Sequence, residues 1–298
     1  MRMIKILALS GLLTATFSSA ALAQPPPALS PGVGPEYDTT HVYVAPTDMA
    51  SFAASFVATF GGKSTKPTTM TVTPAPSSTS FEAVRTPAGS LSVFGFLTPI
   101  PFGFGAERTG YLVKDMDAAI AGAKAAGADV VVAPFPDPIG RDAVIQWPGG
   151  VNMQLYWHTT APHYAAFSTI PENRLYLSKE KADVFIRDFL AFSGGSVTSD
   201  EAAAPGVEIG RPGETYRRVR ITSDFGKAVV AVTDGHLPWP YGREMTGYEV
   251  ADLTATLAKA TASGAHVLVA PYRADQRNAA FVQFPGGYVA EVHAATRP

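Results

Sequence analysis

The 298-residue chain contains no cysteine. Disulfides, thiolate metal sites and cysteine nucleophiles are therefore excluded. Charged residues are also scarce, because they make up 16% of the chain and leave a formal net charge of −2. A chain without a basic excess offers no electrostatic attraction for nucleic acid or for an anionic membrane surface. We therefore expect a small-molecule ligand and no nucleic-acid partner.

Long hydrophobic runs are missing as well. The apolar run at residues 6–17 is too short to span a bilayer comfortably, and no later run reaches about eighteen apolar residues. Arg2 and Lys5 precede this run, and Ala21-Leu22-Ala23 follows it, which is typical of a secretory signal peptide. We predict a signal peptide over residues 1–23, cleaved near Ala23, and a proline-rich linker over residues 24–38. The mature protein would be exported, periplasmic or secreted, without membrane contact.

The chain does contain an internal duplication. A strand, a Pro-Gly-Gly turn and a second strand occur as QWPGGVNMQLYWH at residues 146–158 and as QFPGGYVAEVHA at residues 283–294. The two turns are 137 residues apart (285 − 148). The triplet Thr-Gly-Tyr at residues 109–111 recurs at residues 246–248, with the same offset. A register kept over this length indicates a tandem repeat.

Periodicity divides the chain into four units with the order β-α-β-β-β. In the first unit, an alternating strand begins at His41, and a helix over residues 49–60 carries phenylalanines at four-residue spacing on one face. Asp48 is placed to cap this helix, and Gly61-Gly62 to end it. We therefore predict an α+β fold with two tandem domains, residues 39–160 and 171–296. Their curved mixed sheets would surround cup-shaped cavities.

Three stretches carry a resemblance to a known family, namely HVYVAPTDMASFAASFVATFGG, TGYLVKDMDAAIAGAKAAGADVVVAP and QWPGGVNMQLYWH, with their echoes in the second half. On these stretches, the chain resembles the vicinal oxygen chelate (VOC) superfamily. This superfamily includes the glyoxalases, the bleomycin-resistance proteins and the extradiol dioxygenases. The resemblance implies two glyoxalase-like VOC domains. It also implies metal ligands on the first and last strands of paired units, where the metal polarises vicinal oxygens of a substrate as a Lewis acid.

The positions that correspond to these ligands hold His41, Arg108 and Gln154 in the first half and Arg174, Met245 and Glu291 in the second. The donor atoms of His41, Gln154 and Glu291 suit a divalent ion, whereas those of the other three do not. The resemblance thus implies at most one divalent metal ion, with His41, Gln154 and Glu291 as candidate ligands.

Which units pair decides between two arrangements of these ligands. Pairing within each half would bring His41 to Gln154, and pairing across the halves would bring it to Glu291. In the second arrangement, His293 could replace Met245, because it lies two residues beyond Glu291 and on the same strand face.

The resemblance also implies roles for these residues. We expect Glu291 and His41 to be catalytic, each as a base or a metal ligand. We expect substrate binding from Arg108, Arg174, Tyr43, Gln154 and Tyr156. The residues alone leave simpler alternatives open, with His41 at a strand edge bonded to backbone and Glu291 in a buried ion pair with an arginine.

Arg217, Arg218 and Arg220 alternate along a predicted strand, and we expect a solvated sheet face there rather than an anion site. Three functions remain. The first is an enzyme that acts on a small oxygenated metabolite, metal-assisted and of the lyase, isomerase or dioxygenase type. The second is a metal-free protein that binds or sequesters a small molecule, as bleomycin-resistance proteins do. The third is a scaffold with closed cups. A homodimer is left open.

Overall fold

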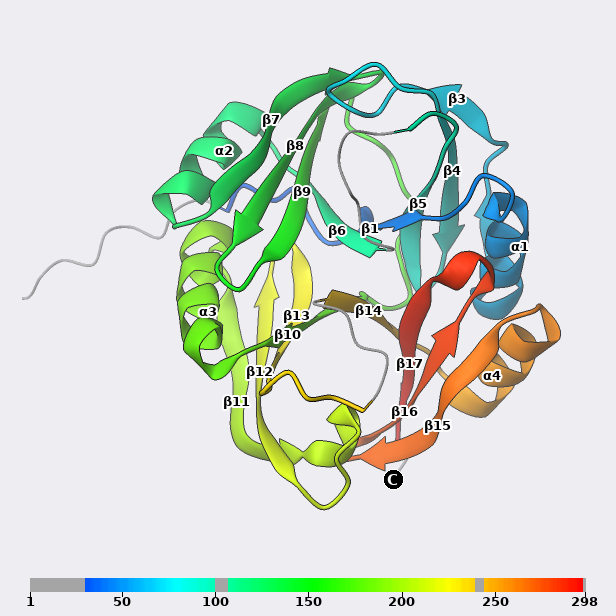
Figure 1. Ribbon diagram of the computed structural model, residues 1–298, viewed down its shortest axis with the longest axis vertical. Coiled ribbons are helices and arrows are strands. Elements are labelled where there is room, and N and C mark those ends of the chain that lie inside the picture. Colours follow the sequence, from blue (N-terminus) through cyan, green and yellow to red (C-terminus); the bar gives the residue numbers. More distant parts are fainter. Residues whose placement is uncertain (1–29, 100–106, 239–243, 297–298) are drawn as a thin grey trace, which may run out of the picture.

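The computed structural model describes residues 30–99, 107–238 and 244–296. The predicted signal peptide lies outside these residues. The four units are present and build two curved mixed sheets, one from each half of the chain (Figure 1). The predicted α+β fold, with two sheets that curve around cups, is confirmed.

Each unit begins with a strand, continues with a helix and returns through further strands. The first half contains β1 (Asp38–Tyr43), α1 (Met49–Phe60), β2 (Lys63–Ser64), β3 (Thr68–Met70), β4 (Thr79–Thr86), β5 (Gly89–Phe96), β6 (Glu107–Leu112), α2 (Met116–Ala125), β7 (Asp129–Asp137), β8 (Gly140–Trp147) and β9 (Val151–His158). The second half contains β10 (Glu172–Leu177), α3 (Lys179–Ser193), β11 (Ser196–Pro205), η1 (Gly206–Ile209), β12 (Thr215–Ser223), β13 (Gly226–Val232), β14 (Glu244–Glu249), α4 (Leu253–Ala262), β15 (His266–Ala274), β16 (Arg277–Gln283), η2 (Pro285–Gly287) and β17 (Val289–Ala295).

The first strands of two units pair at the centre of each sheet. β1 runs antiparallel to β6, and β10 runs antiparallel to β14. The first sheet has the order β2-β4-β5-β1-β6-β9-β8-β7, with β3 beside β4, and the second has the order β11-β12-β13-β10-β14-β17-β16-β15. Each cup is therefore built by the two units of one half.

The hydrophobic core, in contrast, joins the two halves. Phe52 of α1 packs edge-to-face on Phe284 of the fourth unit, with ring centroids 6.2 Å apart. Phe192 of α3 packs on Trp147 of the second unit, at 5.3 Å. Figure 1 shows the helices in two pairs on opposite sides of the molecule, α1 beside α4 and α2 beside α3. The helix-covered face of each sheet is thus buried against the other half, and its opposite face is left to line a cup.

The two Pro-Gly-Gly turns take part in this contact between the halves. Gly149 lies against Leu177 at the end of β10, and Gly286 lies against Val44 just after β1. A Cβ at these glycines would come within 2.8 and 2.7 Å of the neighbouring side chains. Both glycines have a positive φ, 94° and 83°, which side chains disfavour. Both copies of the turn therefore need glycine at this position, for its positive φ and for the close contact with the other half.

The predicted helix over residues 49–60 is confirmed with both of its ends. The predicted cap is wrong, because the Asp48 side chain makes no capping hydrogen bond. Its backbone is already helical (φ −98°, ψ −9°), whereas a capping residue needs an extended one. The sequence pattern missed β2, β3 and β11. These edge strands are largely exposed and lack the apolar alternation that marks a half-buried strand.

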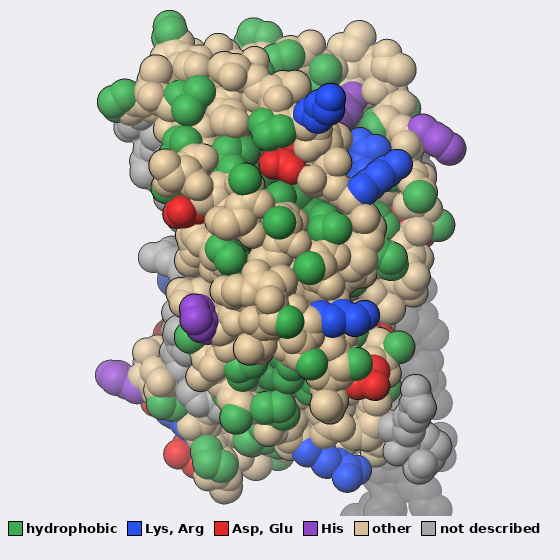
Figure 2. Space-filling view, turned by 90° about the vertical axis from the view of Figure 1, so that its right-hand side faces the viewer, with side chains coloured by type: hydrophobic (Ala, Val, Ile, Leu, Met, Phe, Trp, Pro, Cys, Tyr) green, Lys and Arg blue, Asp and Glu red, His purple; other side chains and the backbone are tan. Residues whose placement is uncertain are grey.

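The end of the predicted linker lies along the first domain. The Val33 amide donates to the Leu112 carbonyl at 3.0 Å, and Asp38 already belongs to β1. On the face drawn in Figure 2, charged side chains of both signs are scattered among uncharged ones. None of the helices in the described ranges is long and apolar enough to cross a membrane.

Candidate functional site

The floor of the first cup forms where β1, β6 and β9 meet. His41 on β1 lies opposite Arg108 on β6, and Gln154 comes from β9 on the other side of β6. All three side chains are buried. Gly110 makes room for them, since a Cβ at this position would lie 2.5 Å from the His41 ring. The within-half pairing therefore brings together His41, Arg108 and Gln154.

The Gln154 side chain is the centre of this floor. Its Oε1 accepts hydrogen bonds from Arg108 Nη2 at 2.5 Å and from His41 Nδ1 at 3.0 Å. Because a guanidinium can only donate, Oε1 must be the acceptor, and His41 Nδ1 must carry the hydrogen. In a neutral His41 the other nitrogen, Nε2, is then unprotonated and is a hydrogen-bond acceptor. Arg108 Nη2 also donates to the hydroxyl of Tyr43.

The imidazole of His41 is neutral at neutral pH. Burial lowers its pKa most, and although Asp38 raises it, Arg108 lowers it again, with the result at about 4. Nε2 lies 3.8 Å from Oδ2 of Asp38. Asp38 in turn accepts hydrogen bonds from Ser92 Oγ at 2.5 Å and from the Tyr164 hydroxyl at 2.7 Å. These contacts fix the acidic neighbour of His41.

The pKa of Asp142 on β8 is shifted upward, in the opposite direction to that of His41. Burial, helped by Asp137, raises the pKa of Asp142 to about 8, although Gln154 and Arg108 lower it in part. The carboxyl group is therefore protonated at neutral pH and can donate a hydrogen bond. Gln154 is one of the groups that lower this pKa, and because its Oε1 is occupied, its amide NH2 is the part that can act on the carboxyl group. A neutral histidine and a neutral carboxylic acid thus line the same cavity on either side of one amide.

A cavity of about 640 Å³ opens above this floor. His41, Asp142 and Gln154 line it together with apolar and aromatic side chains, among them Met70, Phe81, Phe94, Ile139, Tyr156 and Tyr164. A volume of this size with a few converging polar groups is typical of a small-molecule site. Arg108 and Tyr43 are not among the described residues that line the cavity, so Arg108 acts on it through Gln154.

The floor of the second cup is closed by ion pairs. Arg174 on β10 lies opposite Met245 on β14, and Glu291 comes from β17. Arg174 Nη1 lies 3.5 Å from Glu291 Oε1, and His293 Nδ1 lies 2.6 Å from Glu291 Oε2. Burial alone would raise the pKa of Glu291, but His293 and Arg174 lower it overall. Glu291 is 0% exposed and forms a buried ion pair with Arg174, which is the simpler alternative that the sequence left open.

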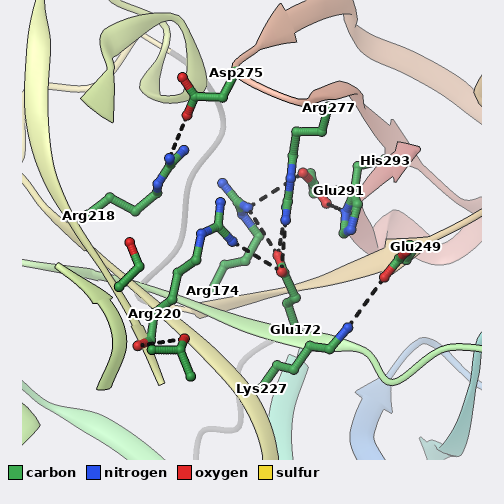
Figure 3. Close-up of polar contacts among 12 residues, drawn as sticks. Glu172, Arg174, Arg218, Arg220, Lys227, Glu249, Asp275, Arg277, Glu291 and His293 are labelled. Carbon is green, nitrogen blue, oxygen red and sulfur yellow. Dashed lines mark hydrogen bonds and ion pairs between the residues drawn. The ribbon is translucent and has the colours of Figure 1, made fainter. Parts of the chain in front are cut away.

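A second cavity of about 690 Å³ lies above these pairs and is rich in charged side chains. Figure 3 shows three arginines that converge on Glu172 from three strands. Arg277 binds it through two contacts of 2.8 and 3.0 Å, Arg220 through one of 3.3 Å, and Arg174 at 3.7 Å. Burial raises the pKa of Glu172, but Arg277 and the other cations hold it well below its usual range.

The expectation of a solvated face for three arginines of β12 is wrong for two of them. Arg218 and Arg220 line the second cavity, and Arg218 is 3% exposed. Only Arg217 points to the other side, where it pairs with Asp183 and Asp200. Arg217 and Arg218 are adjacent on the strand and therefore point to opposite faces, and the even-numbered positions face the cup instead of solvent.

Neither a protein-family model nor a curated protein sequence matches the chain. Solved structures do match it along most of its length. A variant of 4-hydroxymandelate synthase from Streptomyces coelicolor has a TM-score of 0.60 and 14% identity, and the match covers 91% of this chain and 95% of that one. The chain has the vicinal oxygen chelate fold. The resemblance seen in the sequence is confirmed at this level.

Two further VOC-fold structures agree with this result. A 2,3-dioxygenase from Pseudomonas sp. KL28 has a TM-score of 0.56 and 12% identity, with 91% of this chain and 94% of that chain covered. A Mn(II)-bound glyoxalase from Novosphingobium aromaticivorans has a TM-score of 0.55 and 13% identity, with 90% and 84% covered. Identities this low establish the fold alone.

The side chains at the expected ligand positions do not fit a metal ion. In the first cup, the third position beside His41 and Gln154 holds Arg108, whose guanidinium has no lone pair to offer a metal. In the second cup, Glu291 pairs with Arg174, and Met245 lies opposite Arg174 on the neighbouring strand. The candidate set of His41, Gln154 and Glu291 is divided between the two cups. Within the described residues, no group of three or more His, Cys, Asp and Glu side chains is arranged to hold a metal ion.

Sequence reasoning missed three of the residues that shape the two cups, Asp38, Asp142 and Glu172. A signal for Asp142 exists in the Pro-Gly-Gly turn. This turn fixes the register of β8 on β9, so Asp142 lies opposite Tyr156 and on the same face as Gln154. Counting back from the turn would have placed it in the cup.

Proposed function

We propose that this VOC-fold protein works without a metal, and that its first cup binds a small oxygenated molecule and transfers protons to and from it. The observation that carries the proposal is the shared acceptor, Gln154 Oε1, which is held by Arg108 and His41. Arg108 places a fixed positive charge on the floor, where the resemblance implies a metal. Arg108 hydrogen bonds to Gln154, and Gln154 lines the cavity, so the charge of Arg108 acts on the cavity through the Gln154 amide.

The chemistry of the floor supports proton transfer. His41 Nε2 is an acceptor, and the protonated carboxyl of Asp142 is a donor, so the two groups suit a hydroxyl next to a carbonyl. His41 can take a proton from the carbon beside the carbonyl while Asp142 gives one to the carbonyl oxygen. The ligand becomes an enol without a change in its net charge. Pairs of groups whose surroundings drive their pKa values apart commonly supply an acid and a base in this way.

Hydrogen exchange into hydroxyacetone, a small hydroxyketone, tests the proposal. Hydroxyacetone would be incubated with the chelator-treated protein in D2O, and loss of its carbon-bound protons would be followed by NMR. We expect the protein to accelerate the exchange, and His41→Gln to remove the acceleration. His163→Gln is the matched control, because His163 is exposed in the same half and is not among the residues lining the cavity. A requirement for added metal, or full activity in His41→Gln, contradicts the proposal.

The aromatic wall of the first cavity supports a second candidate, a metal-free protein that sequesters a ligand. Phe81 and Phe94 line the cavity with ring centroids 5.5 Å apart, and Phe94 is supported by stacking on Tyr43, at 5.5 Å. Such a wall binds flat, apolar molecules. Binding of an aromatic probe such as phenol, unchanged in His41→Gln and without any exchange activity, would favour this candidate over the enzyme.

We also propose that the protein is exported after cleavage near Ala23. The charged, apolar and small-residue segments of residues 1–23 support this proposal. N-terminal sequencing of protein recovered from the periplasm or the medium tests it, and an intact N-terminus would contradict it. The homodimer stays a prediction, which sedimentation analysis can test.

A further inference from the structure

The second cup has its charges separated into two poles. We propose that it is a separate site for a small zwitterion, whose carboxylate lies toward Arg220 and whose amino group lies toward Asp275. Both residues line the same cavity of about 690 Å³. The inference concerns the second cup alone and does not depend on the function proposed for the first.

The positive pole is the cluster of Arg174, Arg220 and Arg277 around Glu172 and Glu291. Three guanidinium groups face two carboxylates, which leaves one positive charge (3 − 2). Arg220 is the least compensated of the three, because only one of its nitrogens reaches Glu172, at 3.3 Å. Burial and the neighbouring Arg277 also lower its pKa, which means that its charge is poorly stabilised. A carboxylate brought to Arg220 would relieve this excess.

The negative pole surrounds Arg218. Its Nη2 lies 2.8 Å from Glu201 Oε2 and 2.6 Å from Asp275 Oδ2, while its Nη1 lies 2.5 Å from Glu208 Oε1. Two carboxylates, Glu201 and Asp275, therefore share one nitrogen of this guanidinium. The side chains of Glu201 and Asp275 are 41% and 42% exposed and line the cavity, so both are accessible to a ligand. An ammonium group is the natural complement of this pole.

The spacing of the two poles indicates the length of the ligand. Arg218 and Arg220 are two residues apart on one face of β12, which separates their Cα atoms by about 7 Å. Figure 3 shows the Arg218–Asp275 pair on one side of the cavity and the Arg220–Glu172–Arg277 group on another. Val229, which lies opposite Arg220 on β13, contributes apolar surface to the cavity. A short aliphatic chain with a carboxylate at one end and an amino group at the other matches this arrangement.

Calorimetric titration of the mature chain tests the site with three probes that share a four-carbon chain, 4-aminobutanoate, butanoate and butylamine. We expect 4-aminobutanoate to bind at least about tenfold more tightly than the other two. Arg220→Gln should reduce its affinity to that of butylamine, and Asp275→Asn to that of butanoate. Asp275 has a φ of 50°, which asparagine tolerates, and its exposed side chain makes a folding defect in this second variant unexpected.

Arg217→Gln is the matched control, because Arg217 lies on the same strand but pairs with Asp183 and Asp200 on the opposite face. It should bind 4-aminobutanoate like the unaltered protein. The proposal is overturned if 4-aminobutanoate shows no saturable binding at millimolar concentrations, or if butanoate binds equally well. Unchanged affinity in both Arg220→Gln and Asp275→Asn, or an equal loss in Arg217→Gln, also overturns it.

Discussion

Nη2 of Arg108 lies 2.5 Å from Oε1 of Gln154 on the floor of the first cup. The second cup also has one arginine on its floor, but it stands on the other central strand, as Arg174, and faces the carboxylate of Glu291. The arginine is thus matched by a neutral amide in one cup and by an anion in the other. The two floors therefore differ in the charge of the side chain that faces their arginine.

Replacement of this arginine by a metal-binding side chain should create a metal site. Arg108→His would place a third donor beside His41 and Gln154, and three protein donors suffice for a zinc site with an open position. We expect the unaltered protein to hold no stoichiometric Zn²⁺ or Mn²⁺ in equilibrium dialysis with elemental analysis. The variant should gain at least about tenfold in Zn²⁺ affinity.

Arg85→His, at a residue that lines the cavity above the floor, controls for the mere addition of a histidine to the first cup. It should bind no more Zn²⁺ than the unaltered protein. Stoichiometric metal in the unaltered protein, with no gain in Arg108→His, would show that the donor set has been misjudged.

Asp142 should make the folded protein less stable as the pH rises. Its pKa is about 8 in the folded chain and about 3.9 in an unfolded one, so the folded state binds more protons between these values. His41 acts in the opposite sense between about pH 4 and 6.5, because its folded pKa is the lower one. Above pH 6.5 only Asp142 of these two groups contributes, and it lowers the free energy of unfolding by at most about 1.4 kcal/mol per pH unit up to pH 8.

Urea unfolding of the unaltered protein and of Asp142→Asn across this pH range measures the effect. The difference in slope between the two proteins should be the contribution of Asp142. Asp129→Asn, an exposed change on the neighbouring strand β7, should keep the slope of the unaltered protein. An identical slope in Asp142→Asn would mean that this carboxyl group is ionised in the folded chain.

Much of the fold could be predicted because the same turns and strand-start motifs recur in both halves of the sequence. The helix over residues 49–60 was placed correctly, since its phenylalanines and the following glycines mark one face and one end. The edge strands were missed because their exposed Thr, Ser and Lys side chains leave no periodic signal. The pairing of the units could not be predicted, because the central strand β1 offers the same backbone groups to either partner.

The candidate site was predicted only in part. His41 and Gln154 were found because they occupy the cup-facing positions of the first and last strands. Asp142 was not, because the sequence shows a charged turn at this point and gives no direct sign of burial. Of the two last-strand residues, Glu291 was expected to be catalytic, but it is enclosed between Arg174 and His293. Burial and partners decide such roles, and both depend on tertiary packing.

Two equivalent glycines on the cup floors should be intolerant of alanine. A Cβ at Gly110 would lie 2.5 Å from the His41 ring, and one at Gly247 would lie 2.8 Å from Glu291 Oε2. We expect Gly110→Ala and Gly247→Ala each to lower the free energy of unfolding by about 1–3 kcal/mol in urea titrations. Gly122→Ala is the control. Gly122 is an exposed position of α2, where a Cβ would have its nearest neighbour at 3.8 Å, and the alanine should stabilise the helix by about 0.5–1 kcal/mol.

Glu291→Gln separates a structural from a catalytic role for this carboxylate. Loss of one partner from a buried ion pair leaves Arg174 undercompensated, so we expect a drop of about 3–5 kcal/mol in the free energy of unfolding. Hydrogen exchange into hydroxyacetone, which depends on the first cup, should be unchanged.

Adding Arg174→Met to Glu291→Gln should recover part of the lost stability, because removal of both charges costs less than removal of one. Glu180→Gln, an exposed change at the start of α3, should alter stability by less than about 0.5 kcal/mol. If Glu291→Gln were stable but had lost the hydrogen-exchange activity, the carboxylate of Glu291 in the second cup would be catalytic. Recovery in the double variant, in contrast, would mean that the carboxylate serves to balance the charge of Arg174.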